Sequence, residues 1–265
     1  MTYAVRIKKA TGGTGEQTLL SCGSCIDASL SKIEENTHSF ILKYFRKEWR
    51  ILDAGCGLGR WLIYLSDLGF NVAGIDISSD AINILKKMKP ELHLSIGDIS
   101  SMPYRDGEFD AVLSVGVVEH IKDGPAQALD EMRRITRDDG LLILVVPLEN
   151  IIRTFFHRPL CFLRYNISAL LGIKLEFEEY RFSAHDIMNH VVKRGWEIID
   201  KSWVELTPPD RSYSLWVDWG NLLRDRSRSE PFSLNALGRL KKRFLTAISP
   251  WLNAEGIVIS ARKTK

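Results

Sequence analysis

The sequence lacks the features that would place it among membrane-spanning, secreted or strongly basic proteins. It has no run of about 18 uncharged apolar residues and no apolar signal-peptide core near its N-terminus, so we expect no transmembrane segment and a cytoplasmic location. Its formal net charge of +3 is too small to predict specific nucleic-acid binding. The 265 residues, 45% of them hydrophobic, are enough to form one substantial core.

Cysteine is scarce, and of the four cysteines only Cys22 and Cys25 have an informative spacing. A C-x-x-C pair can bind zinc or carry out redox chemistry. A zinc site needs two more ligands, and the sequence has no second C-x-x-C and no paired-histidine motif. We therefore expect reduced thiols and no metal site. The glycine cluster at residues 12–15 has no strand before it and no lysine after it, so it is interpreted as a loop.

The richest segment is ILDAGCGLGR at residues 51–60. A short apolar run ends at Asp53, and Gly55, Gly57 and Gly59 follow at alternate positions before an amphipathic stretch. The pattern predicts a strand, a glycine turn and a helix whose free N–H groups face the turn. It is not a P-loop, which needs Gly-Lys-Ser/Thr. It also departs from the dinucleotide fingerprint, because Arg60 stands where the third glycine is required.

Four further apolar runs follow and alternate with helical patterns. They cover residues 72–76, 92–98, 109–115 and 141–147, and the first two end in Asp76 and Asp98. Continuous apolar strands that alternate with helices predict a parallel sheet covered on both faces. Ligands of such sheets bind beyond the carboxyl ends of the strands, which is where Asp53, Asp76 and Asp98 should meet.

The D-x-G-x-G-x-G segment with its strand-end acids resembles motif I of the class I S-adenosylmethionine-dependent methyltransferases, in their small-molecule, type 11-like branch. The resemblance covers residues 48–150 in register and resumes loosely after residue 180. It implies a doubly wound α/β fold of Rossmann-like type, with a mostly parallel seven-stranded sheet whose last strand, near residues 256–261, is antiparallel. It also implies S-adenosylmethionine as the cofactor.

The same resemblance assigns roles to individual residues. The three glycines would line the methionine part of the cofactor, and Asp53 would reach its ammonium group. Asp76 would hold the ribose hydroxyls, and Asp98 would accept a hydrogen bond from the adenine amino group. The remaining cofactor contacts implied are Ile77, Ile99, Ser114 and Val115. Two structural roles stay open beside these, because Asp53 could be a helix-end acid and Asp98 could cap the turn at Ser100 or Ser101.

His120 is the candidate general base, because it follows the fourth strand and has a suitable intrinsic pKa. A structural histidine at a helix start is the equal alternative.

Two motifs that are missing from the sequence disfavour two classes of methyl acceptor. Residues 114–117 read SVGV, so the Asn/Asp-Pro-Pro-aromatic turn of amino-methyltransferases is missing, and no cysteine follows strands four or five as cytosine C5 enzymes require.

The chain is predicted to be one methyltransferase domain, 1–265, with a helical N-terminal extension at 1–47 and a cofactor-binding half at 48–150. Long connections at 151–180 and 206–254 are predicted as cap insertions on the acceptor side. Residues 1–150 hold 17 basic and 21 acidic side chains, whereas residues 151–265 hold 19 and 12, so the basic half should face the substrate.

The second insertion carries apolar residues at helical spacing, opposite a basic run at 239–243. We expect this stripe to form the core of the cap with its charges in solvent; peripheral contact with an anionic membrane is the alternative.

Three functions of the protein stay open. The leading one is methylation of a small molecule, such as an oxygen of a sugar, quinol or lipid-linked intermediate. The others are methylation of RNA or an acidic protein, and a non-catalytic scaffold. The oligomeric state is not predicted.

Overall fold

A computed structural model describes residues 3–7, 35–173, 176–205, 210–219, 222–228 and 232–264. The predicted loop at residues 12–15 and the Cys22/Cys25 pair lie outside these ranges. No helix among the described residues is both long enough and apolar enough to cross a bilayer.

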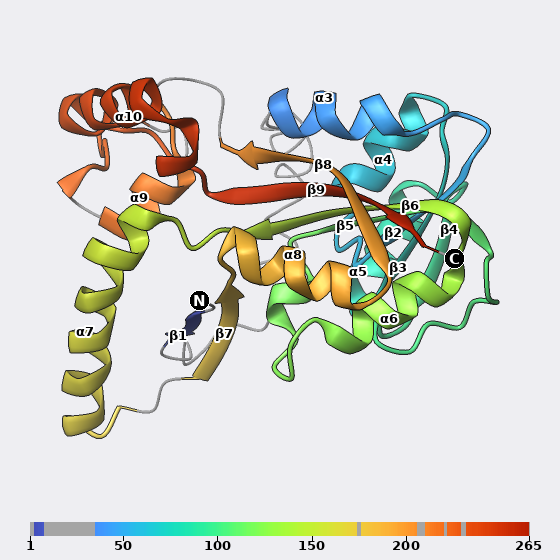
Figure 1. Cartoon of the computed structure of the whole chain (residues 1–265), viewed down its shortest axis with the longest axis horizontal. Coiled ribbons are helices and arrows are strands. Elements are labelled where there is room, and N and C mark those ends of the chain that lie inside the picture. The colour runs from blue at the N-terminus through green and yellow to red at the C-terminus, as the bar shows by residue number, and fades with distance from the viewer. Residues whose placement is uncertain are drawn as a thin grey trace.

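A seven-stranded sheet in the order β4-β3-β2-β5-β6-β9-β8 organises the chain (Figure 1). Its last strand in sequence, β9, pairs antiparallel with both β6 and β8, and the other pairings are parallel. The predicted doubly wound fold is therefore confirmed. The strands are β2 Arg50–Ala54, β3 Asn71–Asp76, β4 His93–Ile96, β5 Phe109–Val115, β6 Thr136–Pro147, β8 Trp196–Val204 and β9 Gly256–Lys263.

Helices cover both faces of this sheet. Buried side chains of α3, α4 and α5 pack on one face, and those of α6 and α8 pack on the other. Strand β6 shows why its sequence is apolar without a break, because Leu142 and Leu144 enter one core while Leu141 and Ile143 enter the opposite one. The helices are α3 Glu35–Tyr44, α4 Arg60–Asp67, α5 Ser79–Met88, α6 Ala126–Ile135 and α8 Ala184–Lys193.

Two helix starts follow from short-range chemistry. The Ser78 hydroxyl accepts a hydrogen bond from the Ala81 N–H at the start of α5, and the Ser183 hydroxyl accepts one from Asp186 at the start of α8. Each serine oxygen satisfies an N–H that the first helical turn would otherwise leave unpaired.

The described residues of the predicted helical extension at 1–47 include a strand as well as a helix. Strand β1, Tyr3–Ile7, pairs antiparallel with β7, Glu176–Arg181, to make a separate two-stranded sheet. Only α3, at the end of the extension, is helical within its described residues. The pairing partner of β1 lies more than 160 positions away, so local sequence could not reveal it.

Both predicted insertions leave the sheet at the edge where its parallel strands end. The first follows Pro147 of β6, and the second joins the end of β8 to the start of β9, where Val204 and Pro147 both pair with Gly256. Figure 1 shows their helices together beyond this edge, with α7 extending away from the sheet. Their elements are η2 Arg153–His157, α7 Arg158–Leu170, α9 Tyr213–Trp219, α10 Ala236–Ile248 and η4 Pro250–Leu252.

The expectation that the apolar stripe of the second insertion forms the core of a cap is only partly correct. Leu234 and Leu245 are buried, but a second set of apolar side chains on α10 is exposed, and Lys242 is buried instead. Lys242 lies inward because its Nζ is 3.3 Å from a carboxylate oxygen of Glu205. The exposed set is Leu237, Leu240, Phe244 and Ile248.

Candidate functional site

The glycine turn lies between the end of β2 and the start of α4. The N–H groups of Gly55 and Cys56 both donate to the carbonyl of Ile75, at 2.8 and 3.0 Å, which fixes the turn against β3. Gly55 has a φ of 85°, and a Cβ added there would lie 2.5 Å from the Val117 side chain. A larger residue at this position would therefore push the turn away from the segment that follows β5.

Gly57 combines a left-handed backbone with open space. Its φ is 52°, and a Cβ added there would meet no atom within 4 Å. Helix α4 begins three residues later, at Arg60, behind Gly59, which provides no side-chain cap, and its first turn contains no acid. The positive end of the α4 dipole lies at this turn, so a negatively charged or polar ligand would be favoured there.

Asp76 points toward the glycine turn. One carboxylate oxygen accepts from the Gly57 N–H at 2.7 Å, and the other accepts from the Ser78 N–H at 2.9 Å. Each oxygen retains a second acceptor position. The predicted strand-end acid is therefore oriented beside the turn and can still receive two hydroxyl donors.

Asp53 lies under the same turn and is 3% exposed. Burial, with a smaller contribution from the negative charge of Asp76, raises the pKa of Asp53 to about 7. A backbone hydrogen bond from Leu62 opposes the rise without cancelling it. A cationic group bound at this carboxyl would stabilise its charged form, so the position fits an ammonium ligand.

The residues predicted to lie near adenine differ in how far they are exposed. Asp98 caps its own turn, because its carboxylate accepts from the Ser100 N–H at 2.7 Å, as the structural alternative predicted. The Asp98 side chain is nevertheless exposed, which leaves its other oxygen accessible. Ile77 is 73% exposed beside Asp76, whereas Ile99 is buried in the core. Of the two isoleucines, Ile77 offers the larger apolar surface to a flat ring.

Strand β5 ends beside this site with Ser114 and Val115. Ser114 is fully buried, and its hydroxyl has no hydrogen-bond partner within the described part of the chain. Val115 is half-buried. Gly116, with a φ of 71°, then turns the chain into the short helix η1, Val118–His120.

Helix η1 directs two titratable side chains to opposite environments. Glu119 is buried, one of its carboxylate oxygens has no partner among the described residues, and burial raises its pKa to about 8. His120 is exposed, and its Nδ1 lies 2.9 Å from the carbonyl oxygen of Glu178 on β7. The sequence pattern pointed to His120 and gave no prediction that Glu119 would be buried. The position of Glu119 directly after apolar Val118 was the available signal.

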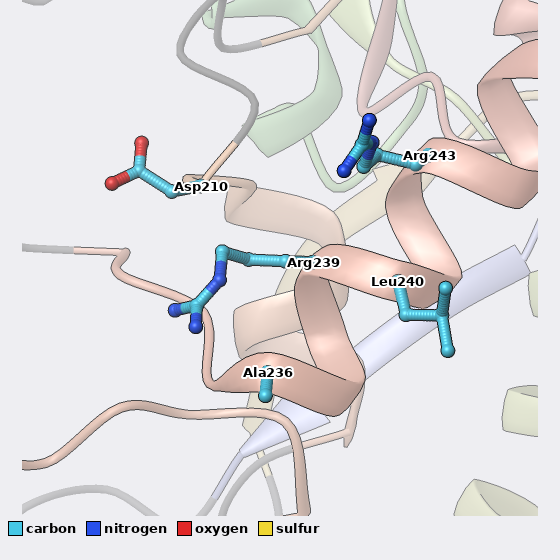
Figure 2. Close-up of a pocket in the computed structure, with 5 residues that line it drawn as sticks. All are labelled: Asp210, Ala236, Arg239, Leu240 and Arg243. Atoms are coloured by element: carbon cyan, nitrogen blue, oxygen red, sulfur yellow. The ribbon is translucent and has the colours of Figure 1, made fainter.

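A cavity of about 520 Å³ opens in the second insertion, on elements that hold none of the predicted cofactor residues. It is lined by Asp210, Ala236, Arg239, Leu240 and Arg243 (Figure 2). Arg239 also donates to the Leu234 carbonyl at 2.7 Å, so its guanidinium is held in place. Arg239 also lies 3.9 Å from a carboxylate oxygen of Asp225, and Asp210 is paired with Arg228, so Arg243 is the lining group that would favour an anionic occupant.

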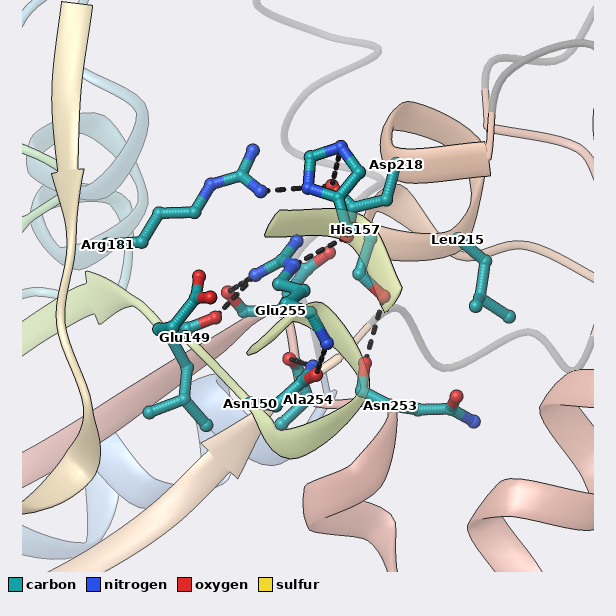
Figure 3. A network of polar contacts seen from close by, with 12 residues as sticks. Glu149, Asn150, His157, Arg181, Leu215, Asp218, Asn253, Ala254 and Glu255 are labelled. Carbon is teal, nitrogen blue, oxygen red and sulfur yellow. Dashed lines mark hydrogen bonds and ion pairs between the residues drawn. The ribbon is translucent and has the colours of Figure 1, made fainter. Parts of the chain in front are cut away.

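A buried polar network joins the two insertions to the sheet (Figure 3). Asp218 of α9 accepts from Arg153 of η2 at 2.6 Å and from Arg181 of β7 at 3.0 Å. Burial alone would raise the pKa of Asp218, but the two guanidinium groups hold it below its usual value. Arg153 also donates to the carbonyls of Leu148 and Glu255, next to the ends of β6 and β9. The insertions therefore pack as one unit against this edge.

Comparison with known proteins identifies a methyltransferase domain in this chain. The family model described as a methyltransferase domain matches residues 52–144. An uncharacterized protein of Methanocaldococcus jannaschii is 32% identical over 181 residues, which are 62% of this chain and 76% of that protein.

Two relatives with described activities are shorter matches. A demethylmenaquinone methyltransferase of Renibacterium salmoninarum is 30% identical over 36% of this chain and 40% of its own length. A malonyl-[acyl-carrier protein] O-methyltransferase of Serratia marcescens is 32% identical over 36% of each chain. This chain thus spans less than half the length of these two proteins.

Solved structures share the fold. A SAM-dependent methyltransferase of Methanosarcina mazei superposes with a TM-score of 0.58 at 19% identity, over 85% of this chain and 97% of that one. A methyltransferase chain solved in complex with the Trm112 methyltransferase activator of Haloferax volcanii gives 0.60 at 14% identity, over 95% and 97%.

Proposed function

This chain belongs to the class I S-adenosylmethionine-dependent methyltransferase family, and we propose that its acceptor is a small, mainly apolar molecule methylated on oxygen. A quinol or a lipid-linked intermediate, including a lipid-linked sugar, would satisfy this description. The observation that carries the proposal is the position of two apolar insertions at the same sheet edge as the glycine turn. One relative is named for demethylmenaquinone and another for O-methylation of malonyl-[acyl-carrier protein], so the relatives include a quinone-type acceptor and an acceptor methylated on oxygen.

The residues around the turn fit S-adenosylmethionine. Gly57 leaves open space before the start of α4, Asp76 accepts from the Gly57 N–H beside that space, and Asp53 is a buried carboxyl without a cationic partner among the described residues. We assign Asp76 to the ribose hydroxyls and Asp53 to the ammonium group. The exposed face of Ile77 and the free oxygen of Asp98 would contact adenine.

The bound cofactor supplies an electrophilic methyl group, so the protein has to hold the acceptor in line and exclude water. Apolar side chains of the insertions would orient the acceptor. The acceptor proton would pass to a group on η1. His120 is accessible there, whereas Glu119 holds its own proton below a pH of about 8 and would act as a base only above it.

The proposal is tested by incubating the protein with isotope-labelled methyl donor and separate lipid-soluble, water-soluble and RNA extracts. Label in the lipid-soluble fraction supports it. Label in RNA or protein, with an affinity that falls steeply with salt, would favour the macromolecular alternative. Cofactor binding without label transfer to any fraction would favour the scaffold.

A further inference from the structure

Helix α10 has an apolar stripe that no described element covers. At 100° per residue, Leu237, Leu240, Phe244 and Ile248 fall within an arc of about 80°. All four are exposed, and Phe244 is 63% exposed. The opposite side of the helix is already used, because Gly238, Lys242 and Leu245 are buried against the rest of the insertion.

The first insertion exposes still more apolar surface. Leu160, Leu163, Ile167 and Leu170 form a comparable stripe on α7, and Leu170 is 87% exposed. Phe155 and Phe156 of η2 and Phe162 of α7 are exposed beside it. Soluble surfaces rarely gather so many large apolar side chains, so patches of this size mark a site of contact.

The basic residues of the two insertions indicate an anionic partner. Residues 150–175 and 232–254 each contain four basic residues and no Asp or Glu. One in each segment, Arg153 and Lys242, is buried in an ion pair, and the charge offered to a partner comes from the others. Arg243 and Lys241 flank the α10 stripe on its two sides, and Lys241 lies 3.1 Å from the centre of the Trp219 ring. The cavity lined by Arg239 and Arg243 opens next to Leu240 of the stripe (Figure 2).

We propose that α7 and α10 form a docking surface for an anionic phospholipid bilayer. An apolar stripe bordered by basic residues lies in the headgroup region, with its apolar side chains reaching about 5–10 Å inward. Helix α7, at 13 residues, rises only about 20 Å, which is short of the roughly 30 Å hydrocarbon core. It therefore lies in the interface or dips into it. The basic cavity beside Leu240 receives a lipid phosphate.

This surface complements the proposed function without depending on it. Both insertions adjoin the carboxyl edge of the sheet, so docking would place the predicted acceptor side next to the membrane. A lipid-linked acceptor would then reach the site without leaving the bilayer. Vesicle binding requires neither the cofactor nor the acceptor, so the two proposals can fail separately.

The test is flotation of the full chain with phosphatidylglycerol vesicles and, in parallel, with phosphatidylcholine vesicles. We expect binding to phosphatidylglycerol to be at least about tenfold stronger, because each basic side chain near an anionic surface adds favourable energy. The double variant Leu163→Asp/Phe244→Asp should lower that binding by at least about tenfold, since it replaces two inserted apolar groups with charges. Arg243→Gln should reduce the preference for phosphatidylglycerol several-fold.

Val192→Asp is the matched control, because Val192 is an exposed apolar residue on α8, away from both stripes. It should bind vesicles like the wild type. Circular dichroism of every variant verifies the fold. Vesicle binding that is absent in the wild type, or unchanged in the double variant, overturns the proposal. A wild-type dimer that the double variant dissociates, without vesicle binding, would instead assign these stripes to contact between two copies of the chain.

Discussion

Arg153 and Asp218 form a buried ion pair, with Nε 2.6 Å from Oδ2, although 65 positions separate them in the chain. Arg153 comes from the first insertion and Asp218 from the second. The contact makes the two insertions interdependent, because removing either partner would strand a charge away from water.

Asp218→Asn should lower the free energy of unfolding by about 3–5 kcal/mol, because Arg153 and Arg181 would lose their shared carboxylate while still buried. Denaturant titration followed by circular dichroism measures the change. Asp67→Asn is the control, since it breaks only the exposed pair with Lys89, and it should cost less than about 1 kcal/mol. Equal effects of the two substitutions would show that the network does not hold the insertions in place.

Asp76→Ala should weaken S-adenosylmethionine binding by about 1–3 kcal/mol, because the ribose hydroxyls would lose their acceptor. Gly57→Val should weaken it further, since it fills open space and strains a left-handed backbone. Titration calorimetry should give one ligand per chain for the wild type. Asp80→Ala, an exposed acid on α5, should bind normally. No binding heat for folded wild-type protein would refute the cofactor assignment.

Asp53 should make the unliganded protein less stable as the pH rises. Its pKa is 3.8 when unperturbed and about 7 in the folded state, so between these values the folded state keeps a proton that the unfolded state has lost. Stability therefore falls across this window and stays lower above it. Asp53→Asn should raise the free energy of unfolding by on the order of 1–4 kcal/mol at pH 8, and by little below pH 4.

The same substitution should weaken cofactor binding if Asp53 contacts the ammonium group. Denaturation at the two pH values, together with calorimetry, measures both effects. Asp80→Asn should change neither. A gain in stability for Asp53→Asn that does not depend on pH would mean that packing, rather than the charge of Asp53, is responsible.

His120→Ala should lower turnover by about 10²–10⁴-fold if His120 is the general base, with cofactor affinity nearly unchanged. His93→Ala, which changes an exposed histidine at the start of β4, is the control. Glu119→Gln separates the two groups of η1, because it keeps the shape of Glu119 and removes its ability to take a proton. Turnover of His120→Ala within a few-fold of the wild type would mean that His120 is structural, as its contact with Glu178 permits.

The sequence alone determined the five apolar strands that form the parallel part of the sheet, together with the glycine turn. These features depend on short-range rules, because the residues of an apolar run or of a glycine turn act within a few positions of each other. The positions of Asp53 and Asp76 at one edge followed as well, since parallel strands bring their carboxyl ends together.

Tertiary structure alone decided which groups are buried and which distant groups meet. The periodicity of α10 revealed an apolar stripe but could not say whether another element covers it, and the buried partner of Glu205 proved to be Lys242. The β1–β7 pairing and the Arg153–Asp218 ion pair likewise join residues far apart in the chain. Such contacts depend on long-range packing of the folded chain, which leaves no periodic pattern in the local sequence.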